Sequence, residues 1–224
     1  MLCVCGLGLA AASCTQENRT NDEPFKYTVD EFADLQILRY RIPGWDSLTV
    51  QQKGYIYHLA EAAKSGRDIL FSQNFKYNLR IRKILENIIE NYKGDKECKE
   101  WQDFIVYAKR VFFSNGIHHH YAEDKIIPEC TPEYMETLLQ AINQGHQAEE
   151  ILPIMYDPDV YPQRKYTGNE LDVIEASAVN FYGPGITKDE VNAFYGKMEE
   201  KGGERPLAYG INSRLVKNDG KLSE

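Results

Sequence analysis

Residues 79–92, Leu-Arg-Ile-Arg-Lys-Ile-Leu-Glu-Asn-Ile-Ile-Glu-Asn-Tyr, carry the apolar pattern that decides the fold class of this chain. Their Leu, Ile and Tyr residues recur three or four positions apart, which places them on one face of an α-helix. Gly94 follows shortly after as a helix terminator. A helix with one apolar face is expected to bury that face in a protein core.

Four other stretches repeat this periodicity, and most have recognisable start or stop signals. We interpret their apolar stripes as core faces, so the sequence predicts a mainly helical body. The predicted helices are Val50–Ala63, which follows the capping box Thr49/Gln52 and ends at Gly66; Trp101–Phe112; Met135–Ile142, between Thr131-Pro132-Glu133 and Gly145; and Val191–Met198, between the capping box Thr187/Glu190 and Gly202-Gly203.

Two stretches are predicted to be extended, which makes the fold class α+β, predominantly helical with short strands. Val173–Tyr182 reads as a strand before Gly183-Pro184-Gly185, and Leu207–Lys217 as a strand that ends in the hairpin turn Asn218-Asp219-Gly220. Only Lys221–Glu224 follow, fewer than the roughly five residues of a typical return strand. We therefore expect a fragment of a longer protein whose unpaired strand edge favours aggregation; a frayed C-terminus is the alternative.

The composition excludes some classes of partner. Apolar residues make up 42% and aromatic residues 12% of the 224 residues, which is typical of a packed globule. The net charge of −8 argues against a general nucleic-acid or anionic-lipid surface. Outside the first fourteen residues only Cys98 and Cys130 remain, too few for a disulfide scaffold.

The N-terminus resembles a bacterial lipoprotein signal. Leu2–Ala12 is apolar but too short to span a bilayer, and Ala11-Ala12-Ser13-Cys14 is typical of cleavage before a lipidated cysteine. No Lys or Arg precedes the apolar run, so an uncleaved apolar terminus stays open. We expect a signal at residues 1–14, a flexible tether at 15–29 and a domain at 30–224. The protein would be exported and anchored to the membrane through Cys14, in the periplasm or at the cell surface.

Residues 112–121, Phe-Phe-Ser-Asn-Gly-Ile-His-His-His-Tyr, concentrate histidine among aromatic side chains. If this segment is extended, His118 and His120 share one face, and Glu123 or Asp124 could add a third metal ligand. No His-Glu-x-x-His spacing supports a zinc site in this chain. Hydrogen-bonded structural histidines and a cleft-lining segment are the other interpretations.

Several blocks together resemble the bacterial branch of the dipeptidyl peptidase III family, from about residue 30 to the end. They are Phe32-Ala-Asp-Leu-Gln-Ile-Leu-Arg-Tyr-Arg-Ile-Pro-Gly44, Gly66-Arg-Asp-Ile-Leu-Phe-Ser-Gln-Asn74, Lys76-Tyr-Asn-Leu-Arg-Ile-Arg82, Asn91-Tyr-Lys-Gly-Asp-Lys96, Phe113-Ser-Asn-Gly-Ile-His-His-His-Tyr121, Phe194-Tyr-Gly196 and Tyr209-Gly-Ile-Asn-Ser-Arg-Leu-Val-Lys-Asn-Asp-Gly-Lys221.

The resemblance implies a two-lobed zinc exopeptidase that releases dipeptides from the N-termini of short peptides. Family members hold zinc on a His-Glu-x-x-x-His helix plus a downstream Glu, and the Glu inside the motif acts as general base. Neither motif occurs in this chain. The resemblance therefore implies the N-terminal portion of such an enzyme, within the lobe built of helices around a β-barrel, with no catalytic residue, no metal ligand and no activity of its own.

The same resemblance suggests substrate-binding residues. In the family, an aromatic residue shortly before a Lys-apolar-apolar-Pro run helps to line the substrate cleft. The corresponding run here is Lys125-Ile-Ile-Pro128, which indicates Tyr121, with His120 beside it and Asn115 in the same segment. Core packing is the alternative role for Tyr121. Two other functions stay open for the whole chain: a non-catalytic peptide-binding lobe, and a metal-binding protein that uses the three histidines.

Overall fold

The computed structural model describes residues 25–197 and 213–224. The predicted signal segment with Cys14 lies outside the described residues, as do Leu207–Asn212 of the predicted strand and Gly202-Gly203. The chain divides into two compact units, residues 1–43 and 44–224. No helix of the described residues is long and apolar enough to cross a membrane.

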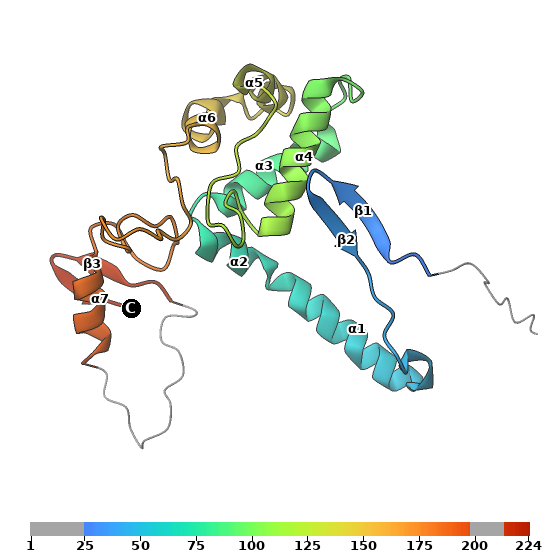
Figure 1. The fold of residues 1–224 in the computed structure, drawn as a ribbon, viewed down its shortest axis with the longest axis horizontal. Helices are drawn as coiled ribbons and strands as arrows, with labels where there is room; N and C mark the ends of the chain where they lie inside the picture. The colour runs from blue at the N-terminus through green and yellow to red at the C-terminus, as the bar shows by residue number, and fades with distance from the viewer. Residues whose placement is uncertain (1–24, 198–212) are drawn as a thin grey trace, which may run out of the picture. The chain divides into compact units, whose positions relative to one another are not determined.

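In the first unit, the described residues form a β-hairpin that the sequence analysis missed. Strand β1 (Thr28–Phe32) pairs antiparallel with β2 (Leu35–Leu38), and the register is irregular between Thr28 and Asp30 (Figure 1). Ala33 enables the two-residue connection by adopting a positive φ of 50°. The hairpin begins at Thr28, inside the segment expected to be a tether.

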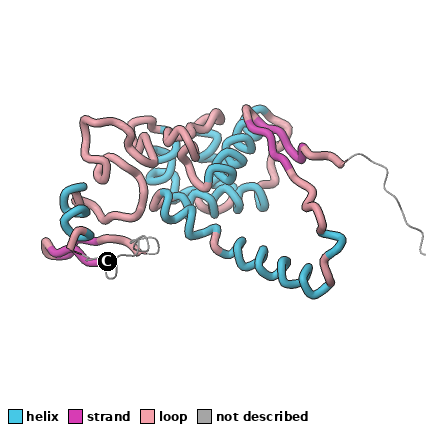
Figure 2. Tube along the Cα trace, turned by 60° about the horizontal axis from the view of Figure 1, so that its bottom comes forward, coloured by secondary structure: helices cyan, strands magenta, loops and turns pink. Residues whose placement is uncertain are grey.

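The described residues of the second unit are mainly helical and include a short hairpin, consistent with the predicted α+β class (Figure 1). A long segment with little regular structure connects α6 to α7 (Figure 2). The elements are η1 (Trp45–Ser47), α1 (Val50–Ser65), α2 (Arg67–Asn74), α3 (Asn78–Asn91), α4 (Lys99–Ser114), α5 (Pro132–Ala141), η2 (Gly145–Gln147), α6 (Ala148–Tyr156), α7 (Lys188–Tyr195), β3 (Val216–Asn218) and β4 (Lys221–Ser223).

The core of this unit forms where α3 packs against α2, α4 and α5. The apolar stripe of residues 79–92 is confirmed as a core face, since Ile81, Leu85 and Ile88 are fully buried. The larger cluster adds side chains of α4, α5 and α6, among them Phe104, Tyr107, Leu138, Leu139 and Ile151. A smaller cluster of Ile186, Val191 and Leu215 joins α7 to the C-terminal segment.

The expectation that the apolar stripe of α1 is a core face is wrong for the described chain. The helix forms as predicted, with the Thr49/Gln52 capping box, but none of its residues is buried. Val50 is 87% exposed and Leu59 is 51% exposed. Because the capping box satisfies the first free N–H groups locally, it defines the helix start without requiring a neighbour to cover the apolar side chains.

The predicted strand Val173–Tyr182 is also wrong: apart from one parallel bridge between Tyr182 and Leu215, the segment is irregular. The carboxylate of Asp172 accepts hydrogen bonds from the backbone N–H of Ile174, at 2.8 Å, and of Glu175, at 3.4 Å. Such a side-chain cap bends the backbone at the point where a strand would begin.

The C-terminal hairpin turn is confirmed, but the expectation that Lys221–Glu224 are too few for a return strand is wrong, because Lys221–Ser223 form β4. Asp219 and Gly220 both have positive φ, and β3 pairs with β4 through three residue pairs from Val216↔Ser223 to Asn218↔Lys221. Leu222 adds packing against the smaller cluster. The tight turn brings the strands directly into register, so even three residues form a ladder. Aggregation of the chain stays a prediction.

The turn after α4 requires a glycine. Asn115 ends α4 with a φ of 53°, and Gly116 follows with a φ of 150°. A Cβ on Gly116 would lie 2.1 Å from Nδ2 of Asn78. That amide is fully buried, and its Oδ1 accepts the N–H of Ile117 at 3.1 Å, so it has little room to move.

We therefore predict that Gly116→Ala lowers the free energy of unfolding by about 2–3 kcal/mol, through overpacking and an unfavourable φ. Gly54→Ala is the matched control, because no atom lies within 4 Å of its added Cβ in helix α1; it should stabilise by about 0.5–1 kcal/mol. Urea denaturation of both variants measures the difference. Equal destabilisation by the two substitutions would contradict this account of the turn.

Candidate functional site

The first histidine of the triple-His segment points into the protein. His118 is 1% exposed, and its Nε2 lies 2.9 Å from the carbonyl oxygen of Tyr161, which requires Nε2 to carry the proton and donate. Its ring meets Phe75 edge-on with centroids 5.5 Å apart. Burial disfavours the charged form and lowers the pKa of His118 to about 4. His118 is therefore a neutral structural histidine at neutral pH.

The next two side chains are half-buried and stack on each other. The rings of His119 and His120 lie 4.7 Å apart, and His120 lies 4.4 Å from Tyr121. Nδ1 of His119 accepts the backbone N–H of Ala122 at 2.9 Å. The expected alternation, with His118 and His120 on one face, is wrong. The backbone turns at this point: the N–H of Glu123 donates to the carbonyl of His119 at 3.1 Å.

A partly buried ion pair fixes this loop. Arg164 donates from Nε and Nη2 to the two carboxylate oxygens of Glu123, both at 2.7 Å. The hydrogen bonds from Arg164 hold the pKa of Glu123 below its usual value. Nη2 of Arg164 also donates to the carbonyl of His120 at 3.1 Å. A bidentate pair in a fixed geometry orders the loop that carries these rings.

The described residues do not provide a metal centre. Across residues 25–197 and 213–224, no group of three or more His, Cys, Asp or Glu side chains is placed to hold a metal ion. Nε2 of His118 and Nδ1 of His119 already make local hydrogen bonds, and Nδ1 of His120 lies 3.4 Å from the hydroxyl of Ser114. The described residues therefore do not fit the local metal site that the triple-His segment left open.

The three residues proposed to bind substrate occupy different environments. Tyr121 is 84% exposed, and His120 lies between it and Phe113. Burial, together with the neighbouring His119, lowers the pKa of His120. Asn115 caps α4, and its carbonyl accepts the side-chain amide of Asn74 at 3.1 Å. None of these three residues lines the pocket described next, and their role in binding substrate stays a prediction.

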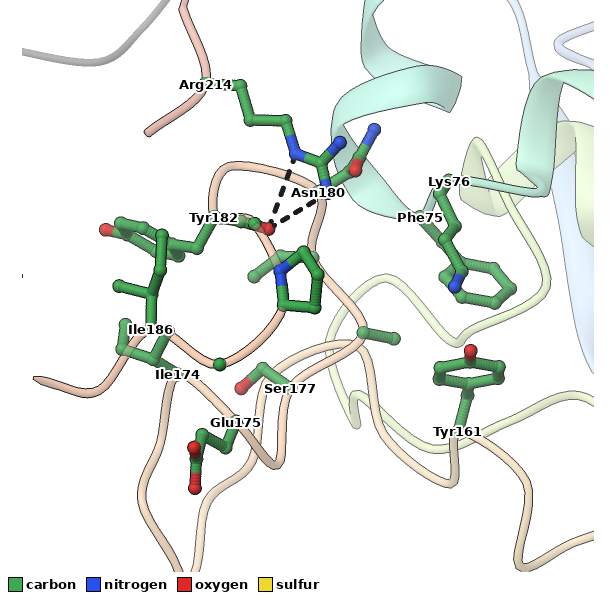
Figure 3. A pocket seen from close by; sticks show the side chains of 15 residues that line it. Phe75, Lys76, Tyr161, Ile174, Glu175, Ser177, Asn180, Tyr182, Ile186 and Arg214 are labelled. Carbon is green, nitrogen blue, oxygen red and sulfur yellow. Dashed lines mark hydrogen bonds between the residues drawn. The ribbon is translucent and has the colours of Figure 1, made fainter. Parts of the chain in front are cut away.

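A pocket of about 330 Å³ (Figure 3) has in its lining Phe75, the residue whose ring His118 meets edge-on. Phe75 and Tyr161 form an aromatic wall with ring centroids 4.8 Å apart, and the amine of Lys76 lies 5.2 Å from the centre of the Tyr161 ring. Ile174 and Ile186 add aliphatic surface. The pocket therefore combines apolar walls with charged groups at its rim, as small-molecule sites usually do.

Two anchors hold the segment 174–186 that lines this pocket. The backbone N–H of Asn180 donates to the carbonyl oxygen of Gln73 at 2.8 Å, and its side-chain amide donates to the carbonyl oxygen of Ser72 at 3.1 Å. These two bonds connect the segment to α2. Gly183 donates to the carbonyl of Leu215 at 2.7 Å. Arg214 reaches the carbonyl of Tyr182, with Nη2 at 3.2 Å.

Sequence reasoning missed this pocket because its lining comes from four separate segments. Lys76 and Arg214 lie within quoted family blocks, but nothing in the sequence shows that they meet one cavity. Tyr161 adopts a positive φ of 53°, and a Tyr between Val and Pro gives no sequence signal for this conformation. The triple-His segment was the available signal, because His118 packs directly behind the aromatic wall.

These features define a mainly helical α+β chain with an amphiphilic pocket of about 330 Å³. Among curated proteins it is similar to dipeptidyl peptidase 3 of Dictyostelium discoideum, with 23% identity over 175 residues. The similarity covers 72% of this chain and 24% of that protein, so the chain spans about a quarter of its relative's length. No family model matches the chain. The comparison supports a distant, dipeptidyl peptidase III-like relationship.

The buried His118 predicts a pH-dependent stability. Its pKa is about 4 in the folded protein and near 6.5 when unfolded, so the unfolded chain binds more protons between these values. The contribution of neutral His118 is present above about pH 6.5 and is lost as pH falls towards 4, by up to about 3 kcal/mol. His118→Gln, which cannot be protonated there, should flatten this part of the profile. Urea denaturation from pH 4 to 7.5 measures it; parallel profiles for the two proteins would refute the assignment.

Proposed function

We propose that this chain is the N-terminal portion of a zinc-dependent dipeptidyl peptidase of the dipeptidyl peptidase III type. The observation that carries the proposal is the match of 175 residues to dipeptidyl peptidase 3, together with the sequence blocks quoted above. The reaction is the release of dipeptides from the N-termini of short peptides. Zinc would supply the activation of water in the complete enzyme.

Within this proposal the chain contributes scaffold and cleft wall. No His-Glu-x-x-x-His motif occurs in its sequence, so the metal ligands belong to other residues of the enzyme. Tyr121 projects from a loop ordered by the Arg164–Glu123 pair, and its ring is tilted against that of His120 with centroids 4.4 Å apart. An exposed ring held at a fixed position can pack on a peptide backbone or side chain at low entropic cost.

A second candidate is a non-catalytic peptide-binding lobe, which the pocket at Phe75 and Tyr161 favours. Both candidates bind peptides, and only the first hydrolyses them. They are separated by the activity of a longer polypeptide that contains this sequence.

The first proposal predicts that the 224-residue chain alone releases no dipeptide. A longer polypeptide that includes the chain and a His-Glu-x-x-x-His helix should release dipeptides from a free-ended pentapeptide, as mass spectrometry of the products would show. Removal of metal with a chelator should abolish this activity and added zinc should restore it. Dipeptide release by the 224-residue chain alone would overturn the proposal.

Tyr121→Ala in that longer polypeptide should raise KM about tenfold, corresponding to the loss of one stacking contact. Because Tyr121 is largely exposed, the melting temperature should stay within about 1 °C of the unmodified protein. Tyr55→Ala, which removes another exposed tyrosine from α1, is the control. If the Tyr121 and Tyr55 variants have the same KM as the unmodified enzyme, Tyr121 is not a substrate-binding residue.

A further inference from the structure

We propose that the pocket beside Phe75 and Tyr161 binds a short peptide with both ends free, its ammonium group at Glu175 and its carboxylate at Arg214. This inference deepens the proposed function, because it assigns a ligand to a pocket that the function does not itself explain. It can be tested on the 224-residue chain by binding alone.

The charges at the pocket rim carry the first step. Figure 3 shows Arg214 and Glu175 at opposite ends of the cavity, with Asn180 near the Arg214 end. The guanidinium of Arg214 bonds only the neutral carbonyl of Tyr182, through Nε at 3.4 Å and Nη2 at 3.2 Å, in the part of the chain that the structure describes. It therefore keeps its charge and further N–H donors available for a carboxylate.

The other end has the opposite charge. Glu175 is exposed, and within the described residues its carboxylate makes neither an ion pair nor a hydrogen bond. Its backbone N–H instead donates to Asp172, which fixes the turn that carries it. A cation at one end and an anion at the other match a ligand of the opposite polarity, that is, a zwitterion.

The walls between the two ends select the body of the ligand. The rings of Phe75 and Tyr161 lie on one side, and Ile174 and Ile186 lie on the other (Figure 3). A volume of about 330 Å³ is at the lower end for small-molecule sites. An extended peptide of two or three residues spans roughly 7–10 Å. The proposed ligand is therefore such a peptide, with one apolar side chain against these walls.

Lys76 strengthens the preference for a carboxylate-bearing ligand. Its amine lies over the rings of Tyr77 and Tyr161, at 5.0 and 5.2 Å, and it forms no ion pair with a carboxylate among the described residues. With Arg214 and Glu175 it leaves one excess positive charge in the lining, on a protein whose net charge is −8. This excess positive charge favours ligands that have a free carboxylate.

The test uses three probes: the tripeptide alanyl-phenylalanyl-alanine, its N-acetyl form and its C-terminal amide. Calorimetric or NMR titration of the 224-residue chain should show that the free tripeptide binds, and that blocking either end weakens binding by at least about fivefold. Binding of all three probes with equal affinity would overturn the proposal. So would the absence of binding by the free tripeptide when it is in roughly 20-fold excess over the chain and its concentration is raised to about 20 mM.

Variants assign the two ends separately. Glu175→Gln should weaken the free tripeptide about fivefold and leave the N-acetyl form unaffected, while Arg214→Gln should weaken the free tripeptide and leave the amide unaffected. Glu170→Gln, an exposed carboxylate that does not line the pocket, is the matched control. Equal losses for all probes would refute the assigned ends. If Arg214→Gln lowers the melting temperature, its weaker binding could come from a damaged fold. The Glu175→Gln variant then tests the assigned ends by itself.

The test distinguishes failure of this inference from failure of the proposed function. Absence of tripeptide binding together with dipeptidyl peptidase activity in the longer polypeptide would remove only the pocket assignment. Binding without that activity would instead retain the pocket and reject the enzyme.

Discussion

The buried amide of Asn78 is the interaction on which the candidate site depends. Its Oδ1 accepts the N–H of Ile117 at 3.1 Å, and its Nδ2 lies 3.5 Å from the carbonyl of Asn115, so one side chain of α3 closes the end of α4. If the buried amide lacked these partners, the folded protein would be destabilised by the full desolvation free energy of the amide. Asn78 therefore fixes the direction in which the chain leaves α4 and turns His118 inwards.

Once His118 points inwards, the other features follow in order. Its Nε2 binds the carbonyl of Tyr161, and its ring packs on Phe75, so the two residues of the aromatic pocket wall are positioned by one histidine. The following residues must turn outwards, and the Arg164–Glu123 pair holds that turn. The half-buried His120 with the exposed Tyr121, on one side, and the pocket, on the other, are thus two consequences of the same backbone path.

The sequence predicted the helices well because their signals are local. Capping boxes at Thr49 and Thr187 and the stripe of residues 79–92 depend on spacings of three or four residues, which the sequence displays directly. It failed where a distant partner decides the outcome. The apolar residues of α1 look like a core face, yet burial depends on what packs there, and Asp172 replaces a predicted strand with a capped turn.

The candidate site shows the same division at the level of single residues. The sequence identified the triple-His segment as unusual, but alternation along an extended chain assigned His118 and His120 to one face. Gly116, with a φ of 150°, and the buried amide of Asn78, 39 residues before Ile117, determine the actual directions. Neither a hydrogen bond to Asn78 nor the positive φ of Tyr161 can be read from spacing, because both depend on the assembled core.

In the pocket, one set of residues forms a fixed wall and another set supplies the charges that would recognise a ligand. Its aromatic wall is fixed by buried contacts of Phe75, Tyr161 and His118, which cost little to keep ordered because packing already restricts their rotamers. Glu175 and Lys76 are exposed and have no carboxylate or cation partner in the described chain, so they retain rotamer freedom until a ligand pairs with them. Affinity for a charged ligand must therefore offset the ordering of those side chains. A rigid wall with mobile charges favours recognition of the free ends of a ligand over tight binding of any one sequence.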